Sequence, residues 1–203
     1  MCYNAEISLN TFIYGLVSAI IVLLLNQTSL DLIIIVLLFT SIQLLEYFTW
    51  KYINNKKINY YLSIIGFFII IIQILYLNYK NLEGYDRLIN LIIILLLSLY
   101  ILNYVNRNNL LYMDKGINGH LRWHWIDIEF PLLLCILFYY LYPSYRKGKY
   151  INLLFTFITL IISFYYYYKY KTWGSMWCYI SNIIWIFLIL RSIYLSQNNF
   201  RFP

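Results

Sequence analysis

The sequence has little charge and almost no alanine. Only 11% of its 203 residues are charged, whereas a soluble domain carries about 25%. Alanine occurs only as Ala5 and Ala19, although membrane helices often use small residues where they pack closely. The shortage of charge excludes a soluble globular domain. The shortage of alanine beside many Ile, Tyr, Asn and Phe residues suggests an AT-rich genome choosing among apolar codons.

Cysteine and familiar catalytic motifs are also scarce. The three cysteines, Cys2, Cys135 and Cys178, make no CxxC pair and predict no disulfide framework. The sequence has no P-loop, GxSxG or HExxH motif, and no glycine-rich filter. Its last apolar segment has no lysine for a retinal Schiff base. These absences argue against the enzymes, channels and rhodopsins that such motifs define.

What the sequence does have is hydrophobic length. Hydrophobic residues make up 63% of the chain, and a membrane-crossing helix needs about 20 mostly apolar residues. Seven stretches meet that requirement, and only short polar connections separate them. We predict an all-α polytopic integral membrane protein, with residues 1–203 forming one domain of seven transmembrane helices. The predicted helices are 7–25, 30–50, 58–77, 88–105, 118–141, 151–168 and 174–195.

The fifth helix is the least regular of these segments. Its unbroken apolar run, 130–141, is twelve residues, or about 18 Å of helix, against about 30 Å of hydrocarbon. We therefore expect the helix to start at Asn118 and to pass through Glu129, with a kink at Pro131. A short helix that starts near Glu129 is the alternative.

The net charge of +7 is expected to meet lipid headgroups rather than nucleic acid. No nucleic-acid motif is present, and the basic residues lie in short connections, so the expected partner is the lipid bilayer. We call side A the side of the membrane on which the first segment begins, and side B the other. Side A receives eight Lys and Arg residues and side B seven, which leaves the orientation open. The oligomeric state is open as well.

Ionisable residues inside membrane spans are candidates for function. In this chain most of them fall at the side A ends of their segments, whereas Arg191 falls near side B and is expected to snorkel. We therefore predict a polar pocket that opens to side A and binds a small ligand, a lipid or a metal. Its expected members are Cys2, Glu6, Gln43, Glu46, His120, Asp127, Trp177, Cys178 and Asn182.

Helical spacing suggests metal chemistry for part of this set. On a helix, His120, His124 and Asp127 would form one stripe, and two imidazoles four residues apart are a metal-ligand spacing. Cys2 and Cys178 would be further ligands, and zinc is the cofactor that such a set suggests. The alternative is that both histidines lie at headgroup level, hydrogen-bonded or hydrated.

Three classes of function stay open. A carboxyl at Glu46, about 6 Å inside Trp50, is expected to be protonated or paired. In the first class, the chain is a ligand-binding or structural membrane protein, and Glu46 makes a structural hydrogen bond. Alternatively, it is a membrane-embedded, lipid-directed enzyme that uses Glu46 as acid or base, His120 as base or metal ligand, and Cys2 or Cys178 as nucleophile. The third class is a transporter or sensor.

Four segments carry a resemblance to a known family. They are MCYNAEISLNTF at 1–12, QLLEYF at 43–48 with Trp50, HLRW at 120–123 and GSMWC at 174–178. Together they resemble uncharacterised multi-pass membrane proteins of giant, mimivirus-like DNA viruses, which commonly have Trp where this chain has Tyr3. The resemblance implies a viral inner membrane or a host cell membrane, and no particular activity. It does not include His124, so it favours His120 over His124 as a functional residue.

Overall fold

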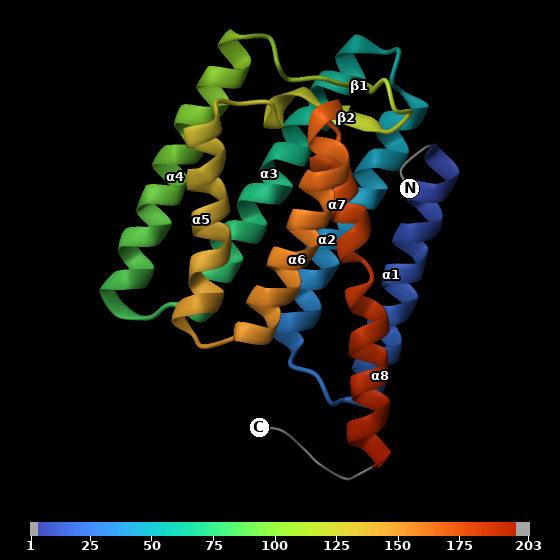
Figure 1. The fold of residues 1–203 in the computed structure, drawn as a ribbon, viewed down its shortest axis with the longest axis vertical. Coiled ribbons are helices and arrows are strands. Elements are labelled where there is room, and N and C mark those ends of the chain that lie inside the picture. Colours follow the sequence, from blue (N-terminus) through green and yellow to red (C-terminus); the bar gives the residue numbers. More distant parts are fainter. Residues whose placement is uncertain (1–3, 198–203) are drawn as a thin grey trace.

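The computed structural model describes residues 4–197, which fold into a bundle of helices (Figure 1). Two three-residue strands, β1 and β2, form an antiparallel hairpin between α4 and α5. Short 3₁₀ helices follow β2 (η1, His124–Ile126) and α6 (η2, Tyr168–Tyr170). The α-helices and the two strands are α1 (Ala5–Leu25), α2 (Leu30–Lys51), α3 (Lys56–Asn81), α4 (Gly84–Arg107), β1 (Met113–Lys115), β2 (Leu121–Trp123), α5 (Phe130–Arg146), α6 (Tyr150–Tyr167), α7 (Trp173–Ser181) and α8 (Ile184–Gln197).

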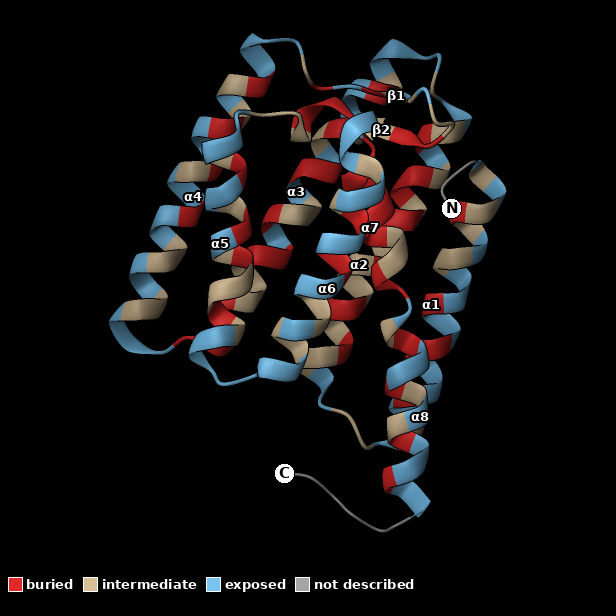
Figure 2. Cartoon of the chain, in the orientation of Figure 1, coloured by how far each residue is buried: buried red, intermediate tan, exposed pale blue. Residues whose placement is uncertain are grey.

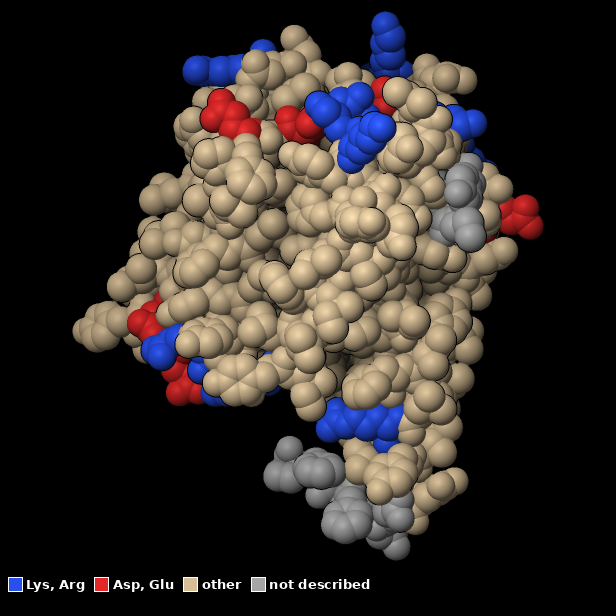
Figure 3. Space-filling view, viewed as in Figure 1, with Lys and Arg blue, Asp and Glu red and all other residues tan. Residues whose placement is uncertain are grey.

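Six helical segments within residues 4–197 are long and apolar enough to cross a membrane. They are α1, α2, α3, α4, the α6–η2 segment and the α7–α8 segment. Charged side chains gather at the two ends of the molecule, and a broad band without them lies between (Figure 3). Outward faces of the helices are exposed and inward faces buried (Figure 2), and Leu24 of α1 and Leu99 of α4 are among the exposed apolar residues. The prediction of an all-α fold is confirmed, and the six segments are consistent with the predicted multi-pass membrane protein.

The predicted fifth helix is wrong over its first half. Residues 118–129 form the second half of the hairpin and η1, and α5 begins at Phe130. Pro131 occupies the first turn of α5, where its missing N–H costs nothing. The alternative of a short helix near Glu129 is therefore correct. The 17 residues of α5 reach about 25 Å, and α5 is not among the six segments.

The predicted last helix, 174–195, is interrupted in the middle. The N–H of Asn182 bonds the carbonyl of Tyr179 at 3.1 Å, only three residues back. This releases the carbonyl of Cys178, which instead accepts a bond of 2.8 Å from the Asn182 side-chain amide. Because no water is at hand inside a bilayer, such a break needs a side chain to satisfy the freed carbonyl.

The break also meets a polar junction of three helices. The Asn182 Oδ1 accepts from the Thr40 hydroxyl at 3.1 Å, and the Trp185 Nε1 donates to the Thr40 Oγ1 at 3.0 Å. Gly15 of α1 lies against this pair, and a Cβ added there would lie 2.3 Å from the Thr40 Cγ2. Glycine at position 15 thus permits the close packing of α1 on α2 and α8.

The hairpin folds over the side A end of the bundle (Figure 1). Its side chains Met113, Leu121 and Trp123 are buried, and Trp123 stacks on Trp125 with ring centroids 5.2 Å apart. Trp125 in turn meets Phe67 of α3 edge to face. The hairpin therefore belongs to the main hydrophobic core and covers the end of the bundle at which the sequence predicts a pocket.

Candidate functional site

The structure buries part of the predicted side A pocket between α2 and α7. Gln43 and Glu46, one turn apart on α2, have exposed fractions of 0%. Cys178 of α7 is also buried, and its thiol lies within electrostatic range of the Glu46 carboxyl. The Trp177 side chain points toward α6, because its Nε1 donates to the Thr159 hydroxyl at 3.2 Å.

The space beside Trp177 and Cys178 is too small for a ligand. It is a gap of about 40 Å³, lined mostly by aromatic and aliphatic side chains, whereas small-molecule sites have volumes of about 300–1,000 Å³. Neither Glu46 nor His120 lines this gap. This part of the predicted pocket is therefore packed core.

The two histidines do not form the predicted helical stripe, because they flank a strand. His120 precedes β2 and packs edge to face on the Tyr167 ring at 5.2 Å between centroids. His124 follows β2, stacks on Tyr112 at 3.8 Å, and places its Nε2 3.0 Å from an Asp114 carboxylate oxygen. Each histidine thus has its own aromatic partner.

A shared metal site is not formed by the described residues. Within residues 4–197, no three His, Cys, Asp or Glu side chains are grouped so that they could hold one metal ion. His120, His124 and Cys178 are therefore not brought together. Cys2, the remaining proposed ligand, lies outside the described residues.

Burial governs the protonation of both histidines. Desolvation lowers the pKa of His120, and it also lowers the pKa of His124 although the hydrogen bond to Asp114 opposes the change. Both residues are buried, and the neutral form is the one that burial favours. The histidines are thus neutral near pH 7 within the cap, which consists of residues 113–127 and comprises the hairpin, η1 and Asp127.

Asp127 makes two ion pairs at the surface of the cap. Its Oδ2 accepts from Arg122 at 2.7 Å and from Lys171 at 2.6 Å, which joins the hairpin to the connection before α7. Burial alone would raise the pKa of Asp127, but these two bonds outweigh it and the pKa is lowered. Glu6, on the first turn of α1, is exposed.

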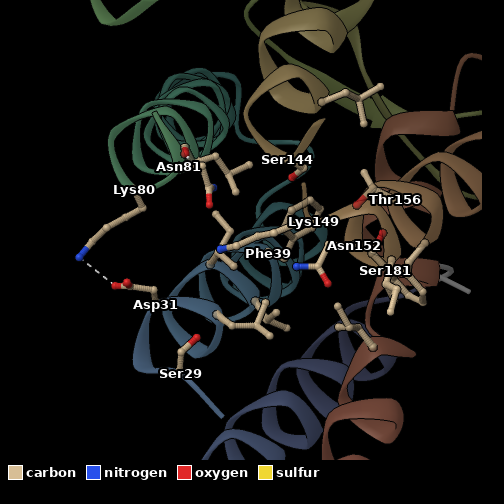
Figure 4. A pocket seen from close by; sticks show the side chains of 18 of the residues that line it. Ser29, Asp31, Phe39, Lys80, Asn81, Ser144, Lys149, Asn152, Thr156 and Ser181 are labelled. Atoms are coloured by element: carbon tan, nitrogen blue, oxygen red, sulfur yellow. Dashed lines mark hydrogen bonds and ion pairs between the residues drawn. The ribbon is translucent and has the colours of Figure 1, made fainter. Parts of the chain in front are cut away.

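A larger cavity lies in the opposite half of the molecule, toward side B. It has a volume of about 450 Å³ and lies between α2, α3, α5, α6 and the α7–α8 segment (Figure 4). Of the predicted pocket members only Asn182 lines it. The polar residues of its wall are Ser29, Asp31, Tyr76, Lys80, Asn81, Tyr140, Ser144, Lys149, Tyr150, Asn152, Thr156, Ser181, Asn182 and Arg191.

The charged residues of the cavity lie at its side B end. Ser29, Lys80 and Lys149 lie at helix ends on side B, whereas Phe39 lies deeper, in the middle of α2. The deeper part combines apolar side chains such as Phe39 with the polar residues Ser181 and Asn182 at the break in the last span. Ile151 and Phe187, which also line the cavity, are 73% and 49% exposed. The cavity therefore borders the apolar outer surface of the bundle.

Charge at the mouth of the cavity is unbalanced. Lys80 pairs with Asp31 at 2.9 Å, and the Tyr76 hydroxyl donates to the same carboxylate at 2.8 Å; Figure 4 shows the pair at the edge. Within residues 4–197, Lys149 and Arg191 have no carboxylate at ion-pair distance. Two positive charges thus remain at the mouth.

Sequence reasoning missed this cavity because no single segment carries its signature. Its wall combines the starts of α2 and α6, the ends of α3 and α5, and the broken last span. Arg191 was the one available signal, and its expected snorkelling is compatible with a place at the mouth.

Comparison with protein-family models, curated proteins and solved structures gives no match to the chain.

Proposed function

We propose that this chain is a multi-pass integral membrane protein that binds an amphipathic lipid in the side B cavity. The observation that carries the proposal is a cavity of about 450 Å³ with a largely apolar wall and a charged mouth. Its volume is in the range of about 300–1,000 Å³ that small-molecule sites occupy. The polar mouth lies where the headgroups of side B would lie, so the tail would enter toward Phe39.

Lipid retention in a filled cavity tests the proposal. We would purify the protein in mild detergent and identify retained lipid by native mass spectrometry. Thr156→Trp adds bulk inside the cavity, whereas Leu154→Trp adds the same bulk on an exposed position of the same helix. We expect the wild type and Leu154→Trp to retain lipid and Thr156→Trp to lose it. Equal retention by all three proteins would contradict the proposal.

We infer that α5 is the seventh helix of the membrane domain. Its length of about 25 Å is near that of the hydrocarbon layer, and it runs alongside α3 and α6. Single cysteines at Asn118 and Lys147, in a protein without native cysteines, would test this with a maleimide that cannot cross the membrane. Labelling from opposite sides is expected, and labelling of both from one side would contradict it.

The resemblance to proteins of giant DNA viruses supports a place in a viral inner membrane or a host cell membrane. Antibody labelling of virions and infected cells tests this location. The catalytic roles proposed for Glu46 and His120 stay predictions, since neither residue lines the side B cavity. The role proposed for Cys2 also stays a prediction, because Cys2 lies outside the described residues.

A further inference from the structure

We infer that the lipid bound in the side B cavity carries an anionic phosphate headgroup, held by Lys149 and Arg191. This inference rests on the lipid binding proposed above. It adds the chemical class of the headgroup and the two side chains that would select it.

The ion pairs on side B do not include Lys149 or Arg191. Each described acid there has a basic partner: Asp31 with Lys80 at 2.9 Å, Asp86 with Arg146 at 2.6 Å, and Glu83 with Lys147 at 2.6 Å. Of the remaining described bases, Arg87 donates to the carbonyl of Leu82 at 2.7 Å and lies over the Tyr79 ring. Only Lys149 and Arg191 both line the cavity and lack a carboxylate partner among residues 4–197.

The position of Arg191 favours a phosphate over a neutral headgroup. Arg191 is half-buried on α8, one turn beyond Phe187, which also lines the cavity. The planar donors of its guanidinium match a phosphate with two parallel bonds. Lys149 offers a second, mobile charge: Figure 4 shows its side chain reaching across the cavity, and it acts on the Asp31 carboxylate from beyond ion-pair distance.

The start of α6 at the mouth acts in the same direction. Lys149, which precedes α6, makes no side-chain hydrogen bond to the first turn, and that turn holds no acidic residue. Free N–H groups and the positive end of the helix dipole both stabilise an anion near a helix start. The start of α2 does not add to this effect, because Asp31 already lies in its first turn.

Competition between two lipids with identical acyl chains tests the inference. Native mass spectrometry of the detergent-purified protein would compare phosphatidylglycerol with phosphatidylcholine. Because each basic side chain near a headgroup contributes on the order of 1 kcal/mol, we expect at least about a tenfold preference for phosphatidylglycerol. Lys149→Gln combined with Arg191→Gln should bring the two lipids close to parity.

Lys56→Gln combined with Lys57→Gln is the matched control. It removes the same charge from exposed positions on side A and should leave the preference unchanged. If the Arg191 variant does not fold, Lys149→Gln alone changes an exposed residue, and added salt should weaken the wild-type preference.

The outcomes separate this inference from the proposed function. Equal binding of both lipids by the wild type, abolished by Thr156→Trp, would overturn the anionic headgroup and leave lipid binding in place. A preference that Lys149→Gln and Arg191→Gln leave unchanged would overturn the assignment of these residues. Lipid binding that no cavity variant reduces would overturn both proposals.

Discussion

Asn59 holds the backbone of Met113 through both ends of its side-chain amide. Its Nδ2 donates to the Met113 carbonyl at 2.8 Å, and the Met113 N–H donates to its Oδ1 at 2.8 Å. Asn59 is 4% exposed and Met113 1%. The Asn59 amide thus satisfies both backbone groups of Met113, as a neighbouring strand would, and it connects the hairpin to α3.

Replacing this amide should loosen the cap. Asn59→Ala leaves a buried N–H and a buried carbonyl without partners, at about 1–3 kcal/mol for each group. We expect a clearly lower melting temperature in thermal denaturation of the detergent-purified protein. Asn108→Ala is the control, because Asn108 bonds one backbone carbonyl on an exposed surface. Equal melting temperatures for the two variants would show that the hairpin does not depend on Asn59.

A methyl group at position 15 should separate α1 from its neighbours. In Gly15→Ala the new Cβ would lie 2.3 Å from the Thr40 Cγ2, and overpacking of this kind costs about 1–3 kcal/mol. The variant should melt at a lower temperature. Thr40→Ser removes the obstructing methyl and keeps the hydroxyl, so the double variant should recover part of the loss. No recovery would mean that the contact is not the cause.

Loss of the Asn182 side chain should destabilise the broken span. Asn182→Leu leaves the Cys178 carbonyl without its side-chain donor and removes the bond from the Thr40 hydroxyl to Asn182, although that hydroxyl still has the Val36 carbonyl as an acceptor. Hydrogen bonds between membrane helices contribute about 0.6–2 kcal/mol each, so we expect a fall in melting temperature of the detergent-purified protein. Asn103→Leu, at an exposed position of α4, should have little effect. A stable Asn182→Leu protein would refute this role.

Acid should weaken the cap through its histidines. The pKa values of His120 and His124 are lowered by burial, so below about 6.5 the unfolded chain takes up protons that the folded chain does not. Stability is therefore complete above about pH 6.5 and decreases as the pH falls toward the lower folded pKa. Melting temperatures at several pH values would follow this, and His120→Gln with His124→Gln should flatten the dependence. An equally steep dependence in that variant would assign it to other groups.

The Cys178 thiol should react only after unfolding. It is 1% exposed, so in a Cys2→Ser, Cys135→Ser background a membrane-permeant maleimide should label it slowly in the native protein and fully in denaturant. Fast labelling of the native protein would reveal access to Glu46 and Cys178, and would favour the enzyme alternative.

Most helices could be predicted from the sequence, because long apolar runs set them. The error at 118–129 came from requiring every apolar run to complete a full span. A hairpin buried against helices can replace the missing half, because Asn59 and the Trp123–Trp125 stack satisfy and cover it. The contact between Asn59 and Met113 leaves no local pattern, since it joins residues that are 54 positions apart in the sequence.

The site was predictable only in part. Depth along the helices places Glu46, Gln43 and Cys178 inside the spans, and the structure buries all three, but depth does not show whether space surrounds them. Space is determined by how helices separate. In this chain they separate toward side B, where α8 diverges from α6 after the break at Asn182 (Figure 1).

The Thr40 junction also has a consequence for the order of assembly. Thr40 lies 142 residues before Asn182 and 145 before Trp185, and α1 packs mainly on α2 and α8. During synthesis, α1 and α2 therefore enter the membrane before α8, and the surface on which α8 packs stays uncovered until that helix is made. A ribosome that stops before residue 182 would release a chain whose first two helices lack their closing partner, which is the kind of product that membrane quality control removes.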